Sequence, residues 1–101
     1  MTPHWYHLVT ENGTAMGSDM VRLPPDSYIA DFRKQVKAEN TNDLGHVDAK
    51  NLTVYLNMAA YENRETVAHL EEDLVVSGYG DSKKNSLIVV VSNKTQGIKI
   101  G

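Results

Sequence analysis

The alternation of apolar and polar residues predicts a hairpin followed by a helix in the first part of the chain. Residues 5–9 are aromatic and β-branched, and residues 20–23 alternate as a return strand. Asn12 and Gly13 lie between these two segments and predict the chain reversal, because both residue types tolerate a positive φ. From about residue 27 to about residue 39, apolar side chains recur at helical spacing.

Residues 52–57 predict a third strand, whose aliphatic side chains face the core. These are Leu52, Val54 and Leu56, alternating with Thr53, Tyr55 and Asn57. Residues 59–80 leave two interpretations open, either a helix in which Val67, Leu70 and Leu74 share a face or a short strand over residues 74–76. Residues 87–91 are continuously apolar, which is typical of a central strand.

This order predicts an α+β fold of the β-grasp (ubiquitin-like) type. In that arrangement one main helix packs across a mixed sheet of four to five strands, and the last strand lies parallel to the first. Ile29, Phe32 and Val36 are the helical side chains expected to face the sheet. We expect one domain over residues 1–92 and a polar tail or start of a linker over residues 93–101.

Composition narrows the possible functions of a chain this short. With 101 residues the chain is expected to build one modest core, and its 41% apolar residues are typical of a globular domain without a membrane span. A net charge of −3 argues against binding to nucleic acid, which requires a basic face. The absence of cysteine excludes disulfides, thiol nucleophiles and cysteine-based zinc sites.

No catalytic, metal or cofactor site is predicted from the titratable residues. The four histidines lack the paired spacing of metal ligands, and His4 and His7 would lie on opposite faces of one strand. Residues 71–73 are consecutive carboxylates, which cannot face each other across a substrate and indicate a solvated turn. We therefore expect a protein that is not an enzyme and that binds no cofactor.

Residues 32–58 match one family pattern at fixed spacing. The matched helix and loop residues are Phe32, Arg33, Val36, Lys37, Asn40, Asn42, Asp43, Val47, Asp48, Ala49 and Leu52. They resemble the N-terminal domain of Crinkler effectors, secreted by oomycete pathogens and also encoded by some fungi, in which L-K-x-x-I-K-x-x-N precedes N-D and V-D-A-x-x-L. The family's translocation motif L-F-L-A-K falls on Val54, Tyr55, Leu56, Asn57 and Met58; the first three are conservative replacements, whereas Asn57 and Met58 depart from A-K.

The resemblance implies a ubiquitin-like N-terminal domain without enzymatic activity. In the family this domain serves secretion and the delivery of a variable C-terminal effector domain into the host cell, where many members reach the nucleus. It would place this protein outside the producing cell and then in the host cytoplasm or nucleus. An alternative is a ubiquitin-like adaptor or modifier, although conjugation requires a Gly-Gly end and this chain ends in Ile100-Gly101.

Strand alternation also predicts a surface for protein partners. If the odd-numbered residues of 87–91 face the core, Ile88 and Val90 point to the opposite side of the sheet, together with Tyr55. An open apolar patch of this kind usually marks a contact surface. We expect Tyr55, Ile88 and Val90 to bind an unidentified protein or a second copy of the chain.

Overall fold

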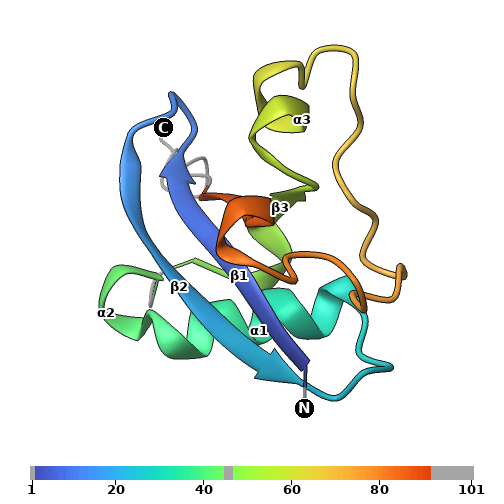
Figure 1. Cartoon of the computed structure of the whole chain (residues 1–101). Coiled ribbons are helices and arrows are strands. Elements are labelled where there is room, and N and C mark those ends of the chain that lie inside the picture. Colours follow the sequence, from blue (N-terminus) through green and yellow to red (C-terminus); the bar gives the residue numbers. More distant parts are fainter. Residues whose placement is uncertain (1, 45–46, 92–101) are drawn as a thin grey trace.

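A long antiparallel hairpin begins the fold, and one helix packs against the sheet that this hairpin helps to form (Figure 1). The computed structural model describes residues 2–44 and 47–91, so the predicted tail over 93–101 lies outside the described residues. The main elements are β1 (Thr2–Thr10), β2 (Ala15–Leu23), α1 (Ile29–Glu39), β3 (Leu52–Tyr55) and β4 (Leu87–Val91). Short helical turns are α2 (Thr41–Leu44), η1 (Ala49–Asn51), α3 (Met58–Glu62) and η2 (Lys83–Asn85).

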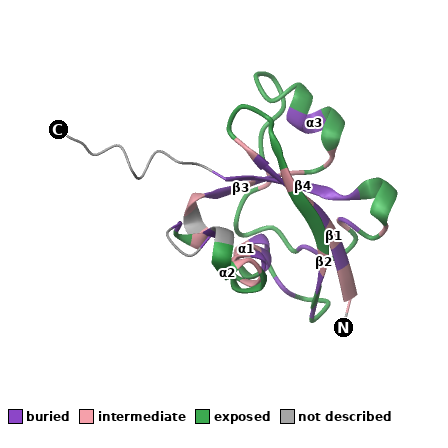
Figure 2. Cartoon of the chain, turned by 90° about the vertical axis from the view of Figure 1, so that its left-hand side faces the viewer, coloured by how far each residue is buried: buried purple, intermediate pink, exposed green. Residues whose placement is uncertain are grey.

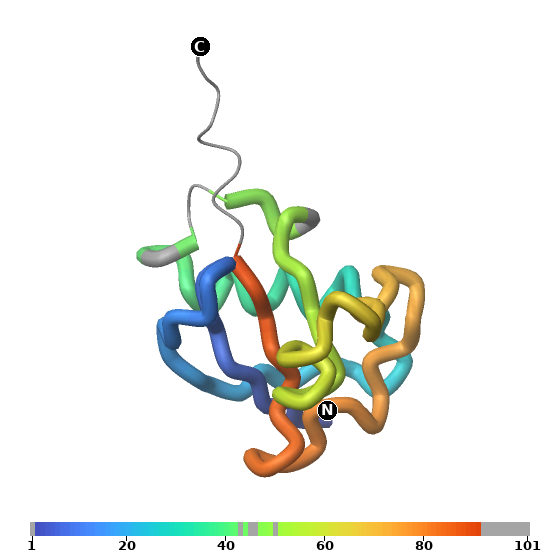
Figure 3. Tube along the Cα trace, turned by 90° about the horizontal axis from the view of Figure 1, so that it is seen from above, coloured from blue at the N-terminus to red at the C-terminus, as the bar shows by residue number. Residues whose placement is uncertain are grey.

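The four strands form one mixed sheet in the order β2-β1-β4-β3. β4 is central, because it runs parallel to β1 on one side and antiparallel to β3 on the other. Figure 3 shows orange-red β4 between blue β1 and green β3. The α+β class, the mixed sheet with one main helix, and the parallel pairing of the last strand with the first are therefore confirmed.

The predicted reversal between the first two strands is confirmed at Asn12 and Gly13. Gly13 has a φ of +89°, a conformation that L side chains rarely adopt. Across the turn, the Thr10 N–H donates to the Thr14 carbonyl at 2.9 Å. The strand that follows is longer than predicted, because β2 begins at Ala15 and pairs with β1 along most of its length.

The apolar stripe of α1 faces the sheet, as predicted. Ile29, Phe32 and Val36 are all completely buried. The Phe32 ring meets the ring of Tyr6 edge-on at 5.9 Å between centroids, which is a favourable arrangement for two aromatic rings. The helix ends near Asn40, whose side-chain amide donates to the Tyr6 hydroxyl at 2.8 Å. This hydrogen bond joins the end of α1 to β1.

The third strand is shorter than predicted, and this corrects one core assignment. Leu52 and Val54 are buried, but Leu56 is 42% exposed because β3 ends at Tyr55. The strand stops there because the Asn57 side chain accepts the Ala60 N–H at 2.8 Å and caps α3.

The segment after α3 contains no helix that includes Val67, Leu70 and Leu74. Its one β interaction in the described part is a bridge between Val75 and Tyr28. Of the two interpretations left open by the sequence, the structure therefore favours the strand, reduced to a single bridge at Val75. Figure 2 shows most of the connection beyond α3 in the colour of exposed residues.

We expect Phe32→Ala to lower the free energy of unfolding by about 3–5 kcal/mol, because the lost ring leaves a cavity under the sheet. Urea unfolding followed by circular dichroism measures the change. Leu56→Ala is the control and should cost much less, about 1 kcal/mol, since 42% of this residue is exposed. A small effect of Phe32→Ala would contradict the central role of this ring.

The buried phenol of Tyr6 predicts a loss of stability in alkali. Burial raises its pKa above the usual 10.0, and the hydrogen bond from Asn40 opposes the shift only in part. Because the folded state holds this proton more tightly than the unfolded state, stability is complete below pH 10 and falls as the pH rises through the folded pKa. Urea unfolding between about pH 9 and about pH 11.5 should show a shallower decline for Tyr6→Phe than for the wild-type protein.

Candidate interaction surface

β4 supplies buried side chains to both faces of the sheet. Leu87, Val89 and Val91 pack in the main core with α1. Ile88 and Val90 point to the other face, as strand alternation predicts, and join a second cluster. A central strand of five buried residues therefore requires cover on both faces, and α1 covers only one of them.

The second cluster is largely closed, which corrects the prediction of an open patch. Ile88 is 1% exposed and Val90 is 9% exposed, while Tyr55 is half-buried. Tyr61, on the short helix α3, packs with them and is itself only 7% exposed. Tyr55 and Tyr61 meet edge-on at 5.8 Å between ring centroids. Of the three predicted patch residues, only Tyr55 thus remains substantially accessible.

The position of Tyr61 follows from a local signal in the sequence. Asn57 caps α3, and the single helical turn that follows carries Tyr61 over β4. Arg64 then lies over the Tyr61 ring, with its guanidinium carbon 4.4 Å from the ring centroid. Its Nη1 also donates to the Tyr61 carbonyl at 2.9 Å. The aromatic ring therefore contacts both the aliphatic side chains of the second cluster and a cation.

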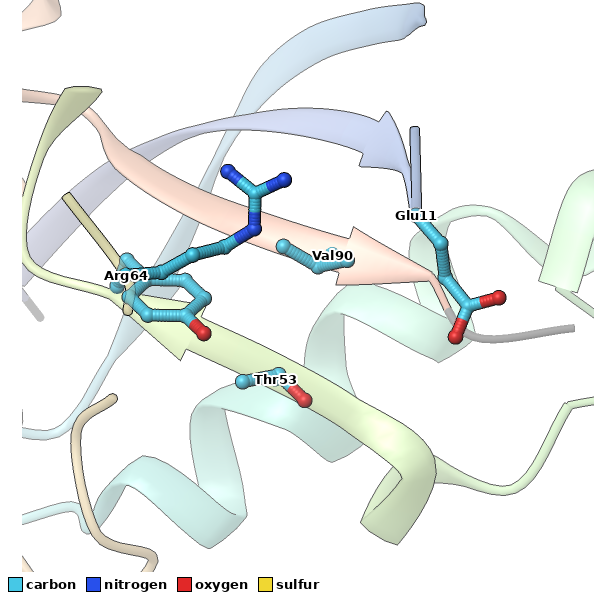
Figure 4. Close-up of a pocket in the computed structure, with 5 residues that line it drawn as sticks. Glu11, Thr53, Arg64 and Val90 are labelled. Atoms are coloured by element: carbon cyan, nitrogen blue, oxygen red, sulfur yellow. The ribbon is translucent and has the colours of Figure 1, made fainter. Parts of the chain in front are cut away.

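A shallow pocket of about 210 Å³ lies beside this cluster. Figure 4 shows its labelled side chains on one side of three neighbouring strands, with Glu11 following β1, Val90 on β4 and Thr53 on β3. Arg64 and Tyr55 complete the lining. The volume is below the range of roughly 300–1,000 Å³ usual for sites of small molecules. The pocket is better suited to one side chain of a protein partner than to a cofactor.

The residues equivalent to the translocation motif lie at the junction of β3 and α3. Val54 is buried in the main core and Tyr55 is half-buried on the outer face. Leu56 and Met58 are 42% and 45% exposed, on either side of the cap residue Asn57. The motif region is therefore divided, with a buried strand at its start and an accessible apolar pair at its end.

The described residues show no arrangement typical of a metal centre. Among them, no group of three or more histidine, cysteine, aspartate or glutamate side chains could hold a metal ion. His4 is buried, where its Nδ1 lies 2.8 Å from the Tyr79 carbonyl and its ring packs edge-on against Phe32. Within the described range, no helix has the length and apolar character needed to cross a membrane.

Sequence reasoning identifies the strand residues of this surface but misses the residues that cover them. Within residues 59–80, the apolar residues at helical spacing begin at Val67. Tyr61 and Arg64 come before this pattern, so it does not include them. The available signal is Asn57 immediately before Met58, since asparagine is a preferred N-cap. Because the predicted strand covers residues 52–57, it assigns Asn57 to the strand and not to a helix N-cap.

Searches against protein-family models and against curated proteins found no match for the chain.

We expect Tyr61→Ala to uncover Ile88 and Val90 and to lower the free energy of unfolding by about 2–3 kcal/mol. Amide exchange of β4 should become faster, and binding of a hydrophobic dye should increase. Tyr61→Phe is the matched control and should leave both measurements nearly unchanged, because it preserves the ring. An unchanged stability of Tyr61→Ala would show that this ring does not cover the second cluster.

Proposed function

We propose that residues 1–92 are a β-grasp, ubiquitin-like N-terminal domain of the Crinkler type. In this proposal the domain has no catalytic role and serves the secretion of a C-terminal effector domain and its translocation into host cells. It acts through contacts with proteins and not through binding of nucleic acid. The localisation that follows is outside the producing cell first, and then in the host cytoplasm or nucleus.

The observation that carries the proposal is that the residues of the family pattern pack together. Phe32 and Val36 from α1 contact the same core as Leu52 and Val54 from β3. Val47, which begins the V-D-A block, is also in this core and is 1% exposed. Residues spaced along a helix, a loop and a strand thus form one packed unit. This supports the view that the family pattern describes residues that pack together in one core.

The polar residues of the pattern have structural roles that suit a β-grasp domain. Asn40 binds both the Tyr6 hydroxyl and the Val36 carbonyl, each at 2.8 Å, and so joins α1 to β1. Arg33 donates to the Leu52 carbonyl at 3.3 Å, at the outer edge of β3. A hairpin, a crossing helix and a final strand parallel to the first are the order of elements expected of a β-grasp.

The exposed end of the motif region supports recognition by a delivery partner. Leu56 and Met58 present apolar side chains that the fold does not bury, next to a rigid capped helix. The backbone of both residues is already ordered, by β3 before Asn57 and by the capped helix after it, so a partner would not have to order this part of the chain on binding.

We expect residues 1–101 fused to a reporter to enter host cells that admit a Crinkler N-terminal domain carrying L-F-L-A-K. In the same assay Leu56→Glu should lose most of the delivered signal, because a charge replaces an apolar contact at the end of the motif. Val67→Glu is the matched control, since Val67 is 39% exposed and lies outside the motif. Absence of entry by the wild-type fusion would contradict the delivery function.

A further inference from the structure

The start of α1 and the segment 71–76 form a second surface, distant in sequence from the motif region. Backbone hydrogen bonds hold the two segments together, from the Ile29 N–H to the Leu74 carbonyl and from the Val76 N–H to the Ser27 carbonyl, both at 2.8 Å. In Figure 1 the amber chain that follows α3 runs beside the cyan start of α1. This corner is therefore a fixed part of the fold.

The corner exposes large apolar side chains that the described structure leaves partly uncovered. Tyr28 and Val75 face each other across an antiparallel bridge and are 49% and 44% exposed. The residue before Val75, Leu74, is 38% exposed. Together they account for three of the six exposed large apolar side chains among the described residues. Such a concentration exceeds the isolated exposed apolar residues that are normal on a protein surface.

The two segments that carry this apolar group are rich in carboxylates. Residues 24–31 and 71–76 carry five of the thirteen acidic residues of the chain and no lysine, arginine or histidine. Only Glu72 has an ion-pair partner in the described structure, at 2.8 Å from Arg33, and Asp31 accepts the Tyr28 N–H. The three other carboxylates, all exposed and without a basic partner among the described residues, are Asp26, Glu71 and Asp73.

We infer that this corner binds a segment of a partner protein that combines apolar residues with lysine or arginine. Apolar side chains of the segment would cover Tyr28 and Val75, and its basic side chains would meet Asp26, Glu71 and Asp73. Charge complementarity selects this partner, because an acidic or neutral segment would leave the carboxylates uncompensated. The inference concerns a different surface from the motif region and does not depend on delivery.

A suitable probe is a fluorescent peptide five residues long, in which lysine and isoleucine alternate. In the control peptide, glutamate replaces each lysine. Fluorescence anisotropy should show binding of the lysine peptide alone, weakening as salt is raised. Backbone amide chemical shifts of the labelled full chain should change at residues 26–31 and 71–76. Absence of binding, or shifts confined to other segments, would overturn the inference.

Matched variants separate this site from general attraction to an acidic protein. Asp73→Lys should weaken binding about tenfold, which corresponds to about 1.4 kcal/mol, while Glu65→Lys makes the same change in net charge elsewhere and should have a much smaller effect. Val75→Ser should likewise weaken binding more than Val67→Ser. Equal effects within either pair would reject the site. A dimer in sedimentation that Val75→Ser dissociates would instead identify a second copy of the chain as the occupant and overturn the inference.

Discussion

The contact between Phe32 and Tyr6 is the interaction on which the rest of the structure depends. Phe32 is completely buried at the centre of α1, and its ring meets Tyr6 on β1 edge-on. Asn40 then binds the Tyr6 hydroxyl, so that one tyrosine holds the middle of the helix by packing and its end by a hydrogen bond. β1 is an inner strand, with β2 on one side and β4 on the other. A helix anchored to β1 therefore lies over the sheet and not at its edge.

The central position of β4 creates the second constraint. All five of its residues are buried, and a strand with apolar side chains on both faces must be covered on both. α1 covers one face, and Tyr61 covers the other from a helix of only five residues. The outer face is consequently small and well packed, and the exposed large apolar side chains of the described residues belong to the junction of β3 and α3, to the connection after α3 and to the residue before α1.

The two proposed contact surfaces have different physical characters. The end of the motif region presents Leu56 and Met58 beside a capped helix, and is suited to a partner that supplies an apolar groove. The corner at Tyr28 and Val75 is rich in carboxylates and is suited to a basic apolar segment. A small domain without a predicted catalytic site can therefore carry two distinct recognition functions.

The sequence by itself determined the local elements, namely the hairpin at Asn12 and Gly13, the buried stripe of α1 and the central strand β4, because each is encoded by neighbouring residues. It also placed Ile88 and Val90 on the face opposite α1, since strand alternation is local. Only the tertiary structure decided that Tyr61 covers them, because exposure depends on residues far along the chain. The meeting of Tyr28 with Val75 was likewise decided by chain packing, which no periodicity encodes.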